Sequence, residues 1–302
     1  MRQPPSSAVA GTAPRPLPPE IAVATEQRRR RIGRQRLLNR ILLYTVATLL
    51  GLFVLIPIYF IAVAAFSPRE AIFAYPKELV PSALSAETIS FFARSTGVLD
   101  SLWRSVLVAI VTLTLSLVLG APAGYAIARY AFRGRDAFRL VILSTRAFPI
   151  VILSIPLAVT FIGWGIYDTI WAVALMHTAL ALPFAVLITA SIFISVPREL
   201  EEAAQTLGST PVGAFFKVVL PLALPGLAAA ALFTFVLSWN EVFAAVILTL
   251  RERTLPAHVL SVLSGSPAPF RFAAGFFLLV PSLIVIFFIR RYLLGMWGRV
   301  IK

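Results

Sequence analysis

The stretch ILLYTVATLLGLFVLIPIYFIAVAA, residues 41–65, carries no charge and exceeds the ~20 residues that a helix needs to cross the hydrocarbon core of a bilayer. Similar apolar runs recur along the chain. Of the 302 residues, 59% are hydrophobic and 13% are charged, whereas soluble domains average about 45–50% apolar and about 25% charged residues. The sequence therefore predicts an all-α polytopic membrane protein.

Six transmembrane helices are predicted. An even number places both termini on one side of the membrane, and 19 Lys and Arg residues lie on that side against 6 on the other. Because positive charge accumulates in cytoplasmic segments, both termini are expected in the cytoplasm. The predicted spans cover residues 41–65, 102–126, 140–165, 169–194, 223–248 and 272–289 of a membrane domain over residues 41–302.

Residues 1–40 form a basic tail that the sequence predicts to be disordered, because its start is rich in Pro, Ala and Ser and has no apolar run. The net charge of +14 raises the question of nucleic-acid binding. Most basic residues instead lie at the ends of apolar spans, where the positive-inside rule and anionic headgroups account for them. These charges are therefore expected to contact membrane lipid, and binding of nucleic acid is not expected.

Several chemistries are excluded by the residues that the chain lacks. There is no cysteine, so disulfides and thiolate chemistry are excluded, and His177 and His258 are the only histidines. A metal site is therefore not expected, and no cofactor is predicted. No G-x-x-x-x-G-K-[ST] phosphate loop occurs, so the chain is not expected to hold ATP.

The connection between the fourth and fifth spans, residues 195–222, has a defined pattern. The sequence there reads VPRELEEAAQTLGSTPVGAFFKVVLPLALPG at residues 196–226. Pro197 and the glutamates after it favour a helix start, and Gly208 fits the left-handed position that ends a helix. Thr210 followed by Pro211 is typical of an N-cap and a first helical position. The sequence predicts a short helix, a tight turn and a second helix in the cytoplasm.

The second helix is too apolar to face water alone, since it carries Phe215 and Phe216. Two interpretations stay open at this point: another protein covers this surface, or the residues pack under their own helical bundle.

A family resemblance rests on this connection. EAAQTLG at residues 202–208 and VVLP at residues 218–221 resemble the EAA motif of bacterial ABC importer permeases. In that family the motif forms a coupling helix that docks on an ATPase subunit. The resemblance implies that the following residues couple this chain to an ATPase: Glu201, Glu202, Ala203, Ala204, Gly208, Phe215 and Pro221.

Further stretches resemble the smaller permease subunit of maltose-type carbohydrate importers. They are APAGYAIARYAFRGRDAF at residues 121–138 and SWNEVFAAVILT at residues 238–249. The resemblance implies a bacterial inner-membrane subunit that moves a sugar or polyol. It also implies a sister permease subunit, two copies of an ATP-binding subunit that hold ATP and Mg²⁺, and an extracytoplasmic substrate-binding protein.

Polar residues inside the predicted spans are candidates for the substrate path, because ionisable groups in a bilayer face a cavity or a partner. Asn240 and Glu241 lie in the fifth span and Arg146 in the third. Two roles stay open for Asn240 and Glu241, namely lining the substrate path and hydrogen bonding between helices. Arg146 is a candidate partner of Glu241. A structural role is predicted for His177.

The same residues also leave other functions to consider. The Thr-Leu-Gly version of the motif also resembles permeases for polyamines or ferric ions, so an importer of a polyamine or metal ion stays open. An ion-driven secondary transporter is disfavoured because inverted repeats and buried carboxylates are not evident. An enzyme is not expected, because the spans contain no H-E-x-x-H motif and no second deep carboxylate.

Overall fold

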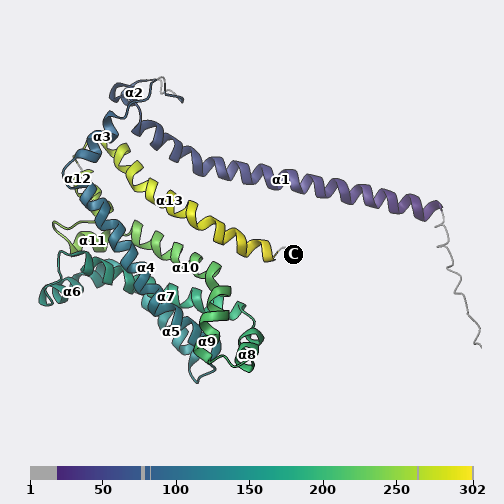
Figure 1. Ribbon diagram of the computed structural model, residues 1–302. Helices are drawn as coiled ribbons and strands as arrows, with labels where there is room; N and C mark the ends of the chain where they lie inside the picture. The colour runs from purple at the N-terminus through teal and green to yellow at the C-terminus, as the bar shows by residue number, and fades with distance from the viewer. Residues whose placement is uncertain (1–18, 76–78, 82, 264, 301–302) are drawn as a thin grey trace, which may run out of the picture. The chain divides into compact units, whose positions relative to one another are not determined.

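A computed structural model describes residues 19–75, 79–81, 83–263 and 265–300 (Figure 1). Within these residues, all regular secondary structure is helical, which confirms the predicted fold class. In the described part of the chain, five helices are long and apolar enough to cross a membrane, and a sixth span results if one sharply bent pair of helices counts as one span. The helices are α1 (Pro19–Ala65), α2 (Arg69–Phe73), α3 (Glu87–Arg94), α4 (Val98–Arg129), α5 (Arg135–Ser144), η1 (Thr145–Ala147), α6 (Ile150–Gly163), α7 (Ile170–Ser195), α8 (Arg198–Thr206), α9 (Pro211–Ala214), the π-helical η2 (Phe215–Val219), α10 (Leu220–Asn240), α11 (Phe243–Leu248), α12 (Leu255–Leu263) and α13 (Ala268–Val300).

The chain divides into two compact units, residues 1–60 and residues 61–302. In the first unit, α1 begins at Pro19. The prediction of disorder for residues 1–40 is therefore corrected for residues 19–40, which are helical, while residues 1–18 lie outside the described residues. After Pro19 this segment has no further proline and is rich in Ala, Glu, Gln, Arg and Leu, which favour helix, and it extends an apolar span that is itself helical.

In the second unit, α4 and α7 lie side by side over most of their length (Figure 1). A Cβ atom on Gly120 would lie 2.9 Å from the Cβ of Ala185, and one on Gly124 would lie 2.7 Å from the backbone nitrogen of Ala190. The Thr189 hydroxyl reaches the backbone oxygen of Gly120 across the interface at 3.0 Å. The two glycines therefore let the helix backbones approach each other, as small residues do in membrane bundles.

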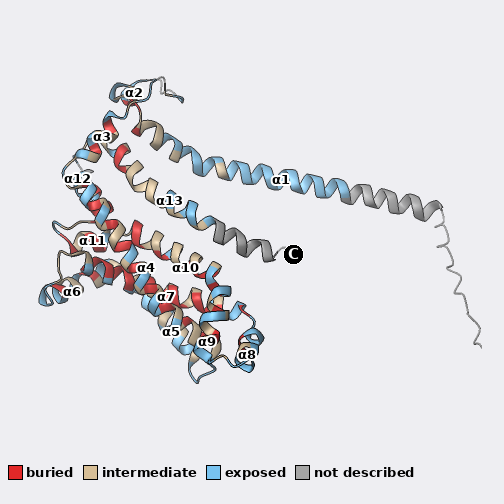
Figure 2. Cartoon of the chain, in the orientation of Figure 1, coloured by how far each residue is buried: buried red, intermediate tan, exposed pale blue. Residues whose placement is uncertain are grey.

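Apart from a cluster between α4 and α7 themselves around Ile127, three apolar clusters of the described residues pack the other helices around this pair. One joins α6, α7 and α11 around Phe161 and Leu248, and another joins α3, α10 and α13 around Phe92 and Trp239. The third surrounds Phe193, where α7 meets the start of α10. Figure 2 shows buried residues along the facing sides of α4, α7 and α10 and mostly exposed residues on α8.

The third span is broken. The sequence predicts one helix over residues 140–165, but α5 and η1 meet α6 at a bend of 87°. Phe148 and Pro149 at the bend are extended, with ψ angles of 122° and 133°. The ring of Pro149 disfavours helical geometry at the residue before it, which explains why the helix stops at this point.

The fifth span also ends early. The sequence predicts one helix over residues 223–248, but α10 ends at Asn240 and the chain is extended at Glu241 before α11 starts at Phe243. Upstream, α9, η2 and α10 form one helical run from Pro211. The π-helical turn lies next to Pro221, whose ring is incompatible with an ordinary i−4 hydrogen bond.

Gly124→Ala is expected to lower the thermal stability of the purified protein by about 1–3 kcal/mol, because the added methyl group overpacks the contact between α4 and α7. The measurement is thermal unfolding in detergent. Gly51→Ala is the matched control, since a Cβ at that position in α1 meets no atom within 4 Å. An unchanged melting temperature for Gly124→Ala would show that the contact is not tight.

Candidate functional site

The first candidate site is the elbow, defined as residues 198–216, where α8 turns into α9. Gly208 has a φ of +92° and no atom would lie within 4 Å of an added Cβ, so the glycine is required by the backbone conformation and not by lack of space. Ser209 N donates to Ala204 O at 3.0 Å to close the helix end. Thr210 Oγ1 accepts a hydrogen bond from Gly213 N at 3.1 Å and Pro211 occupies the first turn of α9, as the sequence predicts.

The elbow exposes large apolar side chains. Leu207 is 88% exposed, Val212 66% and Phe216 59%. The elbow also exposes Glu202, which pairs with Arg198 at 3.1 Å. Of the other predicted coupling residues, Ala203 and Pro221 are exposed and Ala204 is partly buried. Leu207, Val212, Phe216 and Glu202 are thus open to a partner, and the pair of Glu202 with Arg198 is itself exposed.

Glu201 points the other way. It is buried, and its Oε2 accepts a hydrogen bond from Arg129 Nε at 2.9 Å, while the Tyr125 hydroxyl donates to Oε1. Phe215 is also turned inward, with its ring centroid 4.7 Å from that of Tyr125. The two predicted coupling residues Glu201 and Phe215 therefore contact the bundle itself. The sequence does not indicate this division, because consecutive glutamates look equivalent in an exposed helix.

The second candidate site is a cavity of about 840 Å³ between α4, the broken third span and α7. Apolar side chains line most of it, and Arg146 and Glu241 are its charged members. Arg146 Nη1 donates to Leu180 O at 2.7 Å and the guanidinium lies 3.8 Å from the ring centroid of Phe184. The third predicted path residue, Asn240, is exposed outside this cavity and donates to Val236 O of its own helix at 2.8 Å.

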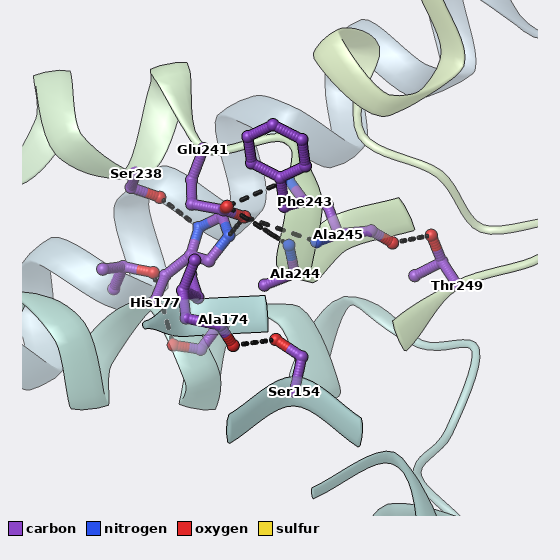
Figure 3. A network of polar contacts seen from close by, with 11 residues as sticks. Ser154, Ala174, His177, Ser238, Glu241, Phe243, Ala244, Ala245 and Thr249 are labelled. Carbon is purple, nitrogen blue, oxygen red and sulfur yellow. Dashed lines mark hydrogen bonds and ion pairs between the residues drawn. The ribbon is translucent and has the colours of Figure 1, made fainter. Parts of the chain in front are cut away.

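The predicted pairing of Arg146 with Glu241 is wrong, because each has other partners. Figure 3 shows the network around Glu241. His177 Nε2 lies 3.1 Å from Glu241 Oε2, and His177 Nδ1 lies 2.9 Å from Ser238 Oγ. His177 has no exposed surface, which agrees with its predicted structural role. The imidazole thus ties α7 to the end of α10.

Glu241 also explains the break in the fifth span. Its Oε1 accepts a hydrogen bond from Phe243 N at 2.9 Å, and its Oε2 accepts one from Ala244 N at 3.0 Å. A side chain that satisfies these backbone groups competes with continuation of α10 and caps the start of α11 (Figure 3). Residues 238–241 interrupt the apolar run at this point, but the run resumes at Val242, so hydropathy alone predicts one continuous span.

A clasp around Asp168 was not anticipated from the sequence. Asp168 has a φ of +58°, and its Oδ1 accepts hydrogen bonds from the backbone nitrogens of Leu250, Arg251 and Glu252 at 2.7, 2.9 and 3.1 Å. Partial burial opposes its ionisation, but these donors and the charge of Arg251 outweigh it and hold the pKa of Asp168 below its ordinary value. The signal in the sequence was an acidic residue in the turn after Gly165.

A bundle of apolar helices with an exposed elbow and a lined cavity defines a membrane transport subunit. Residues 116–294 match the family described as the inner membrane component of binding-protein-dependent transport systems. The chain belongs to this family. It is a permease subunit of an ABC importer in the inner membrane and not an enzyme.

Two relatives show how far the similarity extends. The chain is 30% identical over 262 residues to the trehalose transport system permease protein SugB of Mycobacterium tuberculosis, covering 84% of this chain and 95% of that protein. It is 32% identical over 247 residues to the arabinooligosaccharides transport system permease protein AraQ of Halalkalibacterium halodurans, covering 79% and 88% of the two chains.

A solved structure shares the fold. It is the crystal structure of a bacterial ABC transporter involved in the import of the acidic polysaccharide alginate, with a TM-score of 0.65 at 22% sequence identity. The match covers 84% of this chain and 97% of that one. At this level of identity the likeness establishes the fold alone.

Asp168→Asn is expected to lower the melting temperature at pH 7. The gap between the melting temperatures of the variant and the wild type is expected to narrow below pH ~4, near the ordinary pKa of aspartate. The folded-state pKa is depressed, so the carboxylate stabilises the fold above its unfolded pKa and this stabilisation is lost as the pH falls through the folded pKa. Thermal unfolding from pH 7 to pH 3 measures it, with Asp136→Asn, whose carboxylate is 90% exposed, as the control. A difference that does not depend on pH would contradict the clasp.

Glu241→Ala is expected to destabilise the protein by about 1–3 kcal/mol for each buried partner left unsatisfied, because His177 and the α11 backbone lose their acceptor. Asn240→Ala, which removes an exposed bond within one helix, is expected to leave stability unchanged. Thermal unfolding of both variants decides whether Glu241 holds the fold together or acts only in the substrate path. Equal stability of the two variants would exclude the scaffold role of Glu241.

Proposed function

We propose that this chain moves a sugar or polyol, delivered by an extracytoplasmic binding protein, and that separate ATPase subunits power the movement through the elbow. The names of its relatives support the substrate class, since SugB is named for trehalose and AraQ for arabinooligosaccharides. The observation that carries the coupling role is the exposed apolar face of the elbow, with Leu207, Val212 and Phe216. Contiguous exposed apolar surface marks an interaction site.

The elbow is proposed to dock in a groove of the ATPase, with ATP and Mg²⁺ held by that partner. Glu202 is an acidic residue of the elbow that is available to a partner, because its pair with Arg198 is exposed and therefore weak. A sister permease subunit and two ATPase copies complete the proposed complex.

The proposed orientation places both termini and the elbow, within residues 195–222, in the cytoplasm. The bias of Lys and Arg toward these segments supports it. In this arrangement residues 1–40 form a basic cytoplasmic tail and residues 41–302 form the permease domain. The Asp168 clasp and α12 then lie on the outer side, which faces the binding protein.

The cavity beside the broken third span is the proposed start of the substrate path. Its aromatic and aliphatic walls suit the apolar faces of a sugar ring, and Arg146 and Glu241 supply polar groups. Asn240, exposed at the end of α10, is proposed to continue the path where the sister permease packs. A polyamine or metal ion is disfavoured, because Arg146 repels cations and the carboxylate of Glu241 is already bound to His177.

The test is uptake of radiolabelled trehalose by proteoliposomes that contain the complete complex with its ATPase and binding protein. Uptake is expected to require ATP inside the vesicles and to persist when a protonophore removes the proton gradient. Uptake that fails without the gradient and ignores ATP would identify an ion-driven transporter. A panel that adds maltose, putrescine and Fe³⁺ tests the substrate class.

Gly208→Val is expected to reduce uptake by tenfold or more, because the left-handed conformation costs a side chain about 1–2 kcal/mol and a β-branched one more. The control is Ser209→Val, one residue away at an ordinary φ. Co-purification of the ATPase separates loss of docking from loss of folding. Normal uptake by Gly208→Val would remove the turn from the mechanism.

A further inference from the structure

We propose that Tyr125, Arg129 and Glu201 form a force-bearing joint that makes α8 move as one body with α4 and α7. This inference rests on the proposed coupling function of the elbow and assigns these three side chains as positioning residues. They transmit motion and do not themselves contact the ATPase or the substrate. We call these three residues the joint.

The ion pair of the joint, between Arg129 and Glu201, is buried. The side chains of Arg129 and Glu201 are 8% and 9% exposed, and their contact is 2.9 Å. Arg129 Nη2 also donates to Val196 O at 3.1 Å, and Val196 is the residue that ends α7. One guanidinium on α4 therefore holds the end of α7 and the middle of α8 at the same time. Charge-assisted hydrogen bonds of this kind are stronger than neutral ones.

Aromatic packing surrounds the ion pair. The ring centroid of Tyr125 lies 5.4 Å from that of Phe193 on α7 and 4.7 Å from that of Phe215 in η2, both edge to face. The hydroxyl of the same tyrosine donates to Glu201. Four helical segments, α4, α7, α8 and η2, thus meet at one side chain. This arrangement opposes displacement of α8, because moving α8 away from α4 breaks hydrogen bonds and opens apolar contacts.

The joint acts on a rigid pair of spans. Gly124 directly precedes Tyr125 and lies where α4 and α7 are in closest contact. Ala123 on α4 and Val186 on α7 line the cavity proposed as the substrate path. A displacement of α8 is therefore passed to helices that form the walls of this cavity.

Two neighbouring glutamates have different tasks in this scheme. Glu202 belongs to an exposed pair whose side chains are 66% and 63% exposed, and such pairs contribute little. Removing one partner of a buried pair is costly, because the remaining charge stays uncompensated. Glu202 is suited to a reversible contact with another subunit, and Glu201 to a permanent one within this chain.

The experiment uses the complete complex and reports whether α8 and α4 move together. The chain has no natural cysteine, so Thr206→Cys on α8 and Leu99→Cys at the far end of α4 can carry one spin label each. The inter-label distance is measured without nucleotide and with ATP plus vanadate. An intact joint keeps the distance unchanged, whereas Glu201→Gln in the same background is expected to shift or broaden it.

A second readout separates coupling from mere stability. In Glu201→Gln, the number of trehalose molecules imported per ATP hydrolysed is expected to fall roughly tenfold, which corresponds to the loss of one charged hydrogen bond, while ATP hydrolysis continues. Arg129→Lys keeps the positive charge, so it is expected to lower this import ratio less than Glu201→Gln does. Glu199→Gln, an exposed glutamate on the same helix, is the matched control and should leave the ratio unchanged.

Each outcome has a defined meaning. An unchanged label distance and import ratio in Glu201→Gln would overturn the joint. If that variant does not assemble, Tyr125→Phe decides, because it removes only the hydroxyl: a lower ratio supports the joint and an unchanged ratio overturns it. If the wild type itself neither binds the ATPase nor imports, the proposed function fails. If the wild type and the variants all function equally, only the joint is wrong.

Discussion

In the hydrocarbon region of a membrane no water is available to backbone groups, so every N–H and C=O must find its partner within the protein. Continuous helices meet this requirement by themselves. The two interrupted spans of this chain meet it differently. Pro149 brings no N–H to the bend between α5 and α6, and the carboxylate of Glu241 takes the free N–H groups of Phe243 and Ala244. The architecture depends on these two ways of avoiding unpaired backbone N–H groups, because without them neither break could lie at membrane depth.

Both breaks border the same cavity. Pro149 and Glu241 are among its lining residues, so both local departures from helix contribute to a cavity wall that is otherwise mostly apolar. His177 connects the second break to α7, and the glycines of α4 bring α7 close to α4. The cavity walls are therefore fixed to one another by buried hydrogen bonds and by tight backbone contacts.

At the elbow the requirement is different, since a surface that binds a partner must be exposed and also firmly attached to the bundle. The elbow achieves this by facing two ways. Leu207, Val212 and Phe216 point outward, while Glu201 and Phe215 are held by Tyr125 and Arg129. A loop attached only through its backbone could move without the bundle. Side-chain contacts to two spans make it part of the bundle.

The sequence by itself determined the helical class, the approximate spans and the local shape of the elbow, because these depend on hydropathy and on the conformations of single residues such as Gly208 and Thr210. It also carried the motifs that identify the family. Only the tertiary structure decided which of two adjacent glutamates is buried, that Glu241 binds His177 and not Arg146, and that Asp168 binds a loop about eighty residues away. Those contacts join residues far apart in the chain, and local periodicity carries no information about which distant side chain will meet which.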